Sequence, residues 1–229
     1  RGIEKLKLAG CEVVVGVLDE KCKELNKRFF TFHLKKRPYV VLKWAESFDG
    51  YLSPEGFEEV NLGDVKNRKP YWISNTYSRI FVHKLRAEEQ SILVGARTAL
   101  MDNPKLDVRS YSGKSPLRIL IDRRLSLTKD SNLFDGSAET LVFCESLPEN
   151  NEFLPKVEFV KLGFKDHIEE RVLDELYQRG IQSVIVEGGG QTLNGFIGKG
   201  LWDEAIVIKA KSIFGKGTKA PQISGELKS

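Results

Sequence analysis

Short apolar runs, separated by polar turns and by amphipathic stretches, recur from residue 39 to the end of the chain. In two intervening stretches, apolar side chains recur at spacings of three and four, which predicts helices over residues 75–90 and 167–178. Shorter helices are expected after Gly95 and from Gln191. The most apolar runs predict buried strands at residues 39–45, 91–94, 117–121, 140–143, 183–186 and 205–208. Strands that alternate with helices predict an α/β fold, with a mostly parallel central sheet flanked by helices.

The first 36 residues have a pattern of their own. Residues 1–11 are predicted to form a helical turn, 11–17 (CEVVVGV) a strand, and 19–30 a helix. This helix–strand–helix piece is too small to bury a core by itself. We therefore expect residues 1–36 to be the end of a larger domain and residues 37–229 to form a second domain. The chain begins with Arg, so we expect it to be a piece of a longer protein.

Composition narrows the class of protein. The chain is 41% hydrophobic and 30% charged, with a net charge of +4 spread along its length, which is typical of a globular protein and argues against a nucleic-acid partner. Neither a signal peptide nor a run of roughly 18 apolar residues is present, so we expect a cytoplasmic protein without a membrane partner. Three cysteines (Cys11, Cys22 and Cys144) without a CxxC motif predict free thiols and no metal site.

The residues that follow the predicted strands are the candidates for chemistry, because ligands bind at the carboxyl ends of parallel strands. Glu187-Gly188-Gly189-Gly190 lies between a strand and a helix, where its backbone could hold a phosphate or could simply form a flexible turn. It is not a Rossmann fingerprint, because Leu193 stands where the third glycine would be. Thr98 follows a second strand-to-helix turn and could likewise contact a phosphate or only cap a helix.

Other polar residues are open to two interpretations each. Arg123 could meet the 2′-phosphate of NADPH, and Arg86 could grip a substrate phosphate, although both could be solvated surface arginines. Asp102 is a turn residue unless it is buried and binds polar substrate or cofactor groups, and Asp49 is a turn residue unless the end of its strand faces a pocket. No metal spacing or Ser-His-Asp pattern is apparent. The set favours a phosphate-rich cofactor and hydride transfer, in which the cofactor carries the chemistry.

Taken in order, these motifs resemble the reductase half of the bifunctional riboflavin biosynthesis deaminase/reductase family. The matching segments are Arg37-Pro38-Tyr39-Val40, Ser47-x-Asp49-Gly50, Leu85-Arg86-Ala87, Gly95-x-x-Thr98, Asp102-x-Pro104-x-Leu106-x-Val108-Arg109, Arg118-Ile119-x-Ile121-Asp122, Val186-Glu187-Gly188-Gly189 and Leu201-x-Asp203-Glu204. Residues 1–36 resemble the end of the family's deaminase domain. The zinc-binding H-x-E and P-C-x-x-C motifs are absent from this chain, so we expect neither zinc nor deamination here.

The resemblance implies a dihydrofolate-reductase-like fold, a homodimer and an activity. The family uses NADPH to reduce the ribosyl group of 5-amino-6-(5-phosphoribosylamino)uracil to a ribityl chain. The implied catalytic residues are Lys43, Asp49 and Glu187. The implied substrate contacts are Arg86, Leu106, Arg109 and Glu187. The implied NADPH contacts are Ala45, Trp72, Thr98, Asp102, Arg123, Gly189, Gly190, Gln191, Thr192, Leu193, Asn194 and Gly195.

Three features depart from the family pattern. Pro70 stands where the family often has a substrate-contacting Ser, the loop over residues 51–70 is longer than expected, and the family usually continues beyond Ser229 into another strand. Two other functions stay open. A related NADPH reductase could act on a pterin or folate, and a cofactor-binding scaffold would bind NADPH without turnover. Arg86 and Arg109 favour a phosphorylated substrate.

Overall fold

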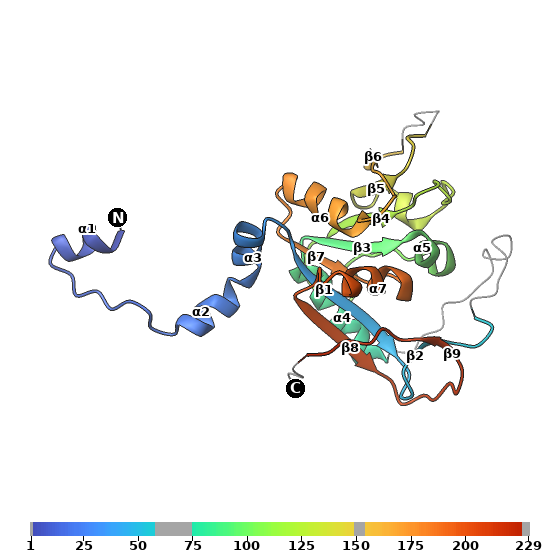
Figure 1. Ribbon diagram of the computed structural model, residues 1–229, viewed down its shortest axis with the longest axis horizontal. Coiled ribbons are helices and arrows are strands. Elements are labelled where there is room, and N and C mark those ends of the chain that lie inside the picture. Colours follow the sequence, from blue (N-terminus) through green and yellow to red (C-terminus); the bar gives the residue numbers. More distant parts are fainter. Residues whose placement is uncertain (1, 58–74, 149–153, 226–229) are drawn as a thin grey trace.

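The computed structural model describes residues 2–57, 75–148 and 154–225. Figure 1 shows helices and strands that alternate around one central sheet, as predicted. The helices are α1 (Gly2–Leu8), α2 (Asp19–Leu25), α3 (Lys27–Lys35), α4 (Thr76–Glu88), α5 (Ala96–Asp102), the short 3-10 helix η2 (Asn132–Phe134), α6 (Ile168–Gln178) and α7 (Gly190–Gly198). The strands are β1 (Tyr39–Glu46), β2 (Tyr51–Pro54), β3 (Ser91–Gly95), β4 (Leu117–Ile121), β5 (Thr140–Cys144), β6 (Val157–Lys161), β7 (Ser183–Val186), β8 (Glu204–Lys209) and β9 (Gly217–Lys219).

Within the described residues, seven strands form the central sheet in the order β6-β5-β4-β3-β7-β1-β8. Every neighbouring pair is parallel, which confirms the predicted α/β class. β1 and β7 lie next to each other although they are more than 130 residues apart in sequence. All carboxyl ends of these strands therefore share one edge of the sheet.

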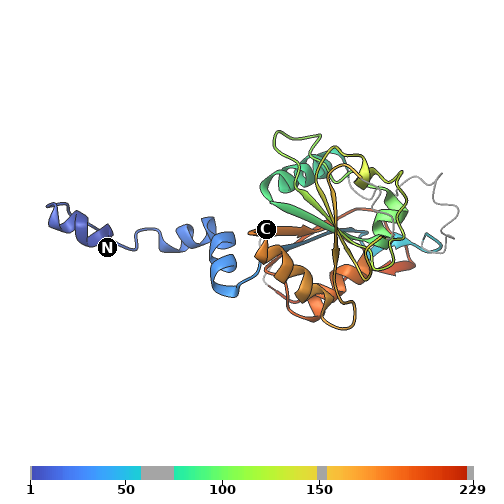
Figure 2. The same cartoon turned by 90° about the horizontal axis from the view of Figure 1, so that it is seen from above.

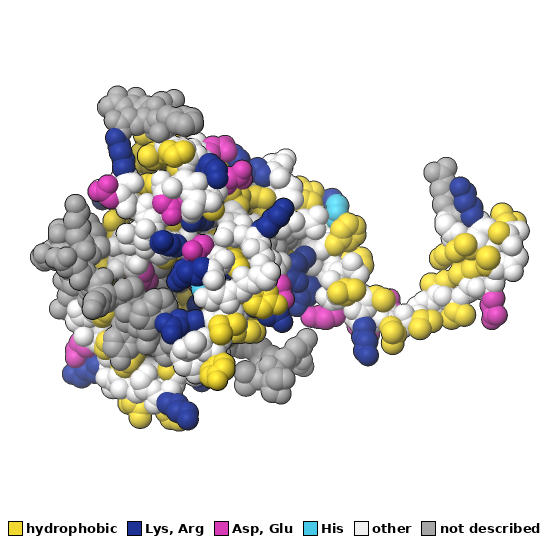
Figure 3. Space-filling model, turned by 180° about the vertical axis from the view of Figure 1, so that it is seen from behind, with side chains coloured by type: hydrophobic (Ala, Val, Ile, Leu, Met, Phe, Trp, Pro, Cys, Tyr) yellow, Lys and Arg dark blue, Asp and Glu magenta, His cyan; other side chains and the backbone are white. Residues whose placement is uncertain are grey.

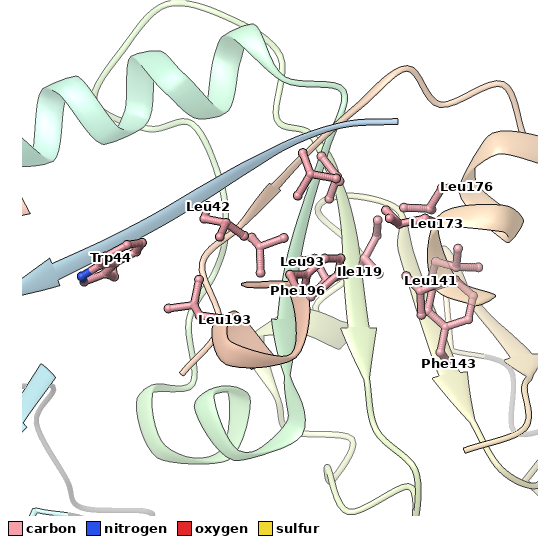
Figure 4. Close-up of a cluster of buried hydrophobic side chains, with 14 residues drawn as sticks. Leu42, Trp44, Leu93, Ile119, Leu141, Phe143, Leu173, Leu176, Leu193 and Phe196 are labelled. Carbon is pink, nitrogen blue, oxygen red and sulfur yellow. The ribbon is translucent and has the colours of Figure 1, made fainter. Parts of the chain in front are cut away.

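Helices cover both faces of the sheet (Figure 2). On one face, side chains from the strands pack against α6 and α7, and Figure 4 shows this cluster, which includes Leu42, Leu93, Leu173 and Phe196. A second cluster lies on the opposite face, where α4 and α5 pack. Successive side chains of a strand point to opposite faces, so Trp44 joins the first cluster, while Lys43 and Ala45 project on the face that α4 covers.

The N-terminal segment extends away from this domain (Figure 1). The prediction of a strand at 11–17 is wrong, because residues 11–16 have no regular structure, and Val14, Val15 and Val17 are 65–71% exposed. An isolated strand leaves its backbone donors and acceptors without partners, and nothing in the described chain pairs with this segment. The predicted helix over 19–30 is two helices, α2 and α3, which meet at Asn26. Figure 3 shows hydrophobic side chains along this segment.

A two-stranded antiparallel ribbon, β2 paired with β9, lies beside the carboxyl end of β1 and was not predicted. Gly217 in β9 adopts a φ of 147°, and a Cβ atom there would lie 1.9 Å from the Ser53 carbonyl oxygen. Only glycine allows this approach. In the part of the chain that is described, no helix is long and apolar enough to cross a membrane.

Candidate active site

Predicted site residues from distant parts of the sequence meet at the carboxyl edge of the sheet and on the face covered by α4. Glu187 directly follows β7, and Arg86 lies in the last turn of α4. Arg86 donates from Nε to Glu187 Oε1 and from Nη2 to Glu187 Oε2, both at 2.8 Å. Lys43 Nζ, from β1, lies 3.5 Å from Glu187 Oε2. The structure thus brings together three residues that are up to 144 positions apart.

This ion cluster is shielded from water. The side chains of Lys43, Arg86 and Glu187 are only 15%, 12% and 7% exposed. Burial alone would raise the pKa of Glu187, but the neighbouring Arg86 and Lys43 charges lower that pKa to about 2. Glu187 is therefore a fixed anion at neutral pH and has no proton to donate. Lys43 makes the longer of the two contacts to Glu187, at 3.5 Å against 2.8 Å for Arg86.

Arg109 lies near this cluster, because Asp107 contacts both Arg86 and Arg109. Its guanidinium pairs with Asp107 and is half exposed, while its backbone N–H donates to His83 Nδ1 at 3.4 Å. Burial, together with the charges of Arg86 and Arg109, lowers the pKa of His83, which is therefore neutral at pH 7. A cavity of about 180 Å³ opens here, and it is lined by Thr76, Arg79, Ile80, His83, Arg109 and Ser110.

Arg86 and Arg109 are thus placed differently, although both were predicted to hold substrate. Arg86 uses Nε and Nη2 on Glu187 and Nη1 on the Asp107 carbonyl oxygen, at 3.2 Å. All three guanidinium nitrogens of Arg86 therefore bond to protein atoms. Arg109 is half exposed and faces a cavity, so its guanidinium can exchange Asp107 for a ligand anion. On the face shown in Figure 3, Lys and Arg side chains gather near the middle.

The glycine turn after β7 is held by Thr98. Thr98 Oγ1, in the first turns of α5, accepts a hydrogen bond from Gly189 N at 2.7 Å. A Cβ atom on Gly188 would lie 2.8 Å from Thr192 Cβ, and one on Gly189 would lie 3.0 Å from Thr98 Oγ1. Helix α7 starts at Gly190, and its N-cap residue Gly189 supplies no side-chain cap. Uncapped amides at a helix N-terminus fit a phosphate-bearing cofactor.

Some predicted cofactor and substrate contacts have buried or engaged side chains. Leu193 and Leu106 belong to the core, so only their backbones could meet a ligand. Leu106 has a φ of 49°, in the left-handed region. Gly195 allows α7 to pack on α6, because a Cβ there would lie 2.1 Å from Glu169 Oε1. Gln191 and Asn194 are exposed on α7.

Asp49 has a structural environment that its sequence context did not reveal. Its carboxylate accepts hydrogen bonds from Ser47 Oγ (2.7 Å), Phe214 N (3.1 Å) and Gly215 N (2.7 Å). Desolvation is the largest single influence and would raise the pKa of Asp49, but these bonds together outweigh it and lower that pKa. The residue is exposed, and its role in the active site stays a prediction. Its bonds tie the turn after β1 to the loop before β9.

Two other predicted residues, Arg123 and Asp102, are exposed at the surface. Arg123, after β4, forms a two-bond pair with Glu145 at 2.8 and 2.9 Å on the surface. Asp102 is exposed at the end of α5 rather than buried, and Ala45 is half-buried on β1. Trp72 and Pro70 lie outside the described residues. Among the residues that are described, no group of three or more His, Cys, Asp or Glu side chains could hold a metal ion.

Known proteins are similar to this chain in sequence and in fold. Residues 38–228 match the RibD C-terminal domain family. The riboflavin biosynthesis protein RibD of Aquifex aeolicus is 36% identical over 219 residues, which cover 95% of this chain and 58% of that protein. RibD of Bacillus amyloliquefaciens is 37% identical over 237 residues, which cover 99% of this chain and 60% of that protein. The chain therefore spans about three fifths of the length of these curated relatives.

A second Aquifex aeolicus protein, named 2,5-diamino-6-ribosylamino-4(3H)-pyrimidinone 5′-phosphate reductase, is 29% identical over 196 residues, which cover 83% of this chain and 84% of that protein. Among solved structures, a Thermotoga maritima diaminohydroxyphosphoribosylaminopyrimidine deaminase/5-amino-6-(5-phosphoribosylamino)uracil reductase is 37% identical, with a TM-score of 0.79 over 96% of this chain and 58% of that one. The Saccharomyces cerevisiae reductase Rib7, 22% identical with a TM-score of 0.62 over 87% of this chain and 90% of that one, shares the fold. The resemblance drawn from the motifs is confirmed, and the chain belongs to the RibD C-terminal domain family.

Proposed function

We propose that this chain is an NADPH-dependent reductase of riboflavin biosynthesis, which converts 5-amino-6-(5-phosphoribosylamino)uracil into 5-amino-6-(5-phosphoribitylamino)uracil. One observation carries the proposal: the buried Lys43–Glu187–Arg86 cluster adjoins the uncapped glycine turn at Gly188–Gly190. The Thermotoga maritima protein, whose name includes this reductase activity, supports the same substrate. The full-length protein is proposed to be bifunctional, with a zinc deaminase half.

The glycine turn is the proposed cofactor site. Backbone amides at the start of α7 would hold the pyrophosphate, and Thr98 fixes the turn through its bond to Gly189. Thr98, Ala45 and the exposed Gln191 are the side chains best placed to line this site. Bound NADPH would supply a hydride to C1′ of the opened sugar. The chain's task is to orient the two reactants and to supply a proton.

The substrate is proposed to lie between Lys43 and Arg109. Arg109 would bind the 5′-phosphate, because its half-exposed guanidinium faces the cavity beside α4. Glu187, held ionised by Arg86, would accept hydrogen bonds from hydroxyl or amide groups of the substrate. Lys43 Nζ would hold the proton that the substrate nitrogen takes up when hydride adds to the C1′=N bond of the opened sugar.

The first test measures NADPH oxidation by this chain with the phosphoribosylaminouracil substrate, and with NADH as the control cofactor. We expect turnover with NADPH, and an Arg109→Ala variant whose KM for the substrate rises about 10-fold while NADPH affinity is unchanged. NADPH binding without turnover would favour the scaffold function. An Arg109→Ala variant with unchanged KM would favour a pterin or folate substrate. Homodimerisation and a cytoplasmic location stay predictions.

A further inference from the structure

Helix α3 contacts the reductase domain through ion pairs. Lys27 Nζ lies 2.8 Å from Glu204 Oε2, and Arg28 pairs with Glu89 at the end of α4. The Tyr39 ring lies beneath both cations, and its centroid is 5.3 Å from Lys27 Nζ and 5.5 Å from Arg28 Cζ. A cavity of about 300 Å³, lined by Glu24, Leu25, Lys27, Arg28, Val41, Leu85, Glu88, Glu89, Glu204 and Ile206, separates the elements. The junction therefore combines these ion pairs with an aromatic contact between Phe32 and Tyr177, whose ring centroids lie 4.7 Å apart.

The Arg28–Glu89 pair is the most buried of these contacts. Arg28 Nε donates to Glu89 Oε2 at 3.0 Å, and Nη2 donates to Oε1. The Glu89 side chain is only 2% exposed. Glu89 is also the C-cap residue of α4, where the helix dipole disfavours an anion. A buried carboxylate at this end of a helix requires a cation, and Arg28 supplies it.

Glu89 is directly connected to the candidate active site. It lies three residues, almost one helical turn, after Arg86, and its backbone N–H donates to the Leu85 carbonyl oxygen at 3.2 Å. Arg86 and Glu89 therefore move together as parts of one helix end. Arg28 holds that end from one side, while Glu187 holds Arg86 from the other. A shift of α4 along its axis would lengthen both bonds from Arg86 to Glu187.

We propose that the Arg28–Glu89 pair positions Arg86 against Glu187, so that helix α3 contributes to the activity of the reductase site. Arg28 precedes residues 38–228, which match the family, and touches neither Lys43 nor Glu187 in the structure. It acts through α4, as a positioning residue. The kinetic part of this inference rests on the proposed function.

A merely structural role predicts a different outcome. If Arg28 only neutralises a buried charge, Arg28→Ala destabilises the protein, and adding Glu89→Gln restores both stability and activity because no charge is left to neutralise. If the pair positions α4, the double variant Arg28→Ala/Glu89→Gln recovers its Tm but not its activity. The matched control is Lys35→Ala, which breaks a 2.7 Å ion pair from the same helix to Asp203, away from α4.

The experiment uses the whole chain and two measurements well below the Tm of each variant. We expect kcat/KM to fall about 10-fold in Arg28→Ala and in the double variant, and to stay unchanged in Lys35→Ala. The NMR signal of the Arg86 Nε–H group, assigned by its loss in Arg86→Lys, should shift in the first two variants only.

A double variant with the wild-type Arg86 signal would overturn the inference, as would one with wild-type kcat/KM. The NMR measurement needs no substrate. If the wild-type chain shows no turnover, the proposed function fails while the Arg86 signal still decides whether Arg28 positions α4.

Discussion

Glu187→Gln removes the charge at the centre of the Lys43–Glu187–Arg86 cluster while keeping the shape of the side chain. The pKa of Glu187 is lowered from 4.5 to about 2. At about 1.4 kcal/mol per pKa unit, this shift corresponds to about 3 kcal/mol of folding free energy. Removal of one partner from a buried pair costs about 3–5 kcal/mol, so the two values agree. We expect the variant to lose about 3 kcal/mol at pH 7.

The pH dependence identifies the source of this loss. Because the folded-state pKa is depressed, the ionised carboxylate stabilises the fold fully above about pH 4.5, and this stabilisation is lost as the pH falls towards 2. Urea unfolding of both proteins between pH 7 and pH 3 measures it. The difference between wild type and Glu187→Gln should be constant down to about pH 5 and then shrink.

The control variant is Glu145→Gln, which removes a carboxylate from the exposed pair with Arg123. A surface pair of this kind contributes less than about 1 kcal/mol, so its loss should be small at every pH. A Glu187→Gln loss as small as that of the control would refute the reasoning. So would a loss that does not change between pH 5 and pH 3, because it would not come from the carboxylate charge.

Two further predictions concern the cofactor turn and the proton. Gly188→Ala should weaken NADPH binding about 10-fold, because its Cβ would collide with the first turn of α7, whereas Gly198→Ala, with nothing within 4 Å, should bind NADPH normally in a fluorescence titration. If both variants bind NADPH with the same affinity, the glycine turn is not part of the NADPH site. Lys43→Met should lower kcat by about 100-fold with NADPH affinity unchanged, as steady-state kinetics and the same titration can test. An unchanged kcat would assign the proton to another group or to water.

Most of the central sheet could be predicted from the sequence, because its strands are buried on both faces and appear as continuous apolar runs. β6 was missed, since Val157–Lys161 lies at the sheet edge and contains charged residues. The ribbon of β2 and β9 was missed because it joins short segments about 165 residues apart. The strand predicted at 11–17 is not formed. Its residues favour a strand, but no partner strand lies within the described chain.

The candidate site was predictable as a set of residues but not as an arrangement. Glu187 and the glycine turn follow a strand, and that position alone indicated the sheet edge. The pairing of Glu187 with Arg86 depends on two elements about 100 residues apart, which no local pattern encodes. The partners of Asp49 and Arg123 were equally invisible, since they come from residues 214–215 and from Glu145.

The position of β1 also constrains how the protein is made. This strand pairs on one side with β7 and on the other with β8, which ends at Lys209. During synthesis, roughly 160 residues must be added after β1 before both neighbours exist, which takes roughly 10–30 s at ribosomal rates. Until β7 ends at Val186, the apolar run at 39–45 has neither neighbouring strand. The nascent chain therefore depends on slow, long-range closure of its sheet, and chaperones that hold exposed apolar segments should raise its folding yield.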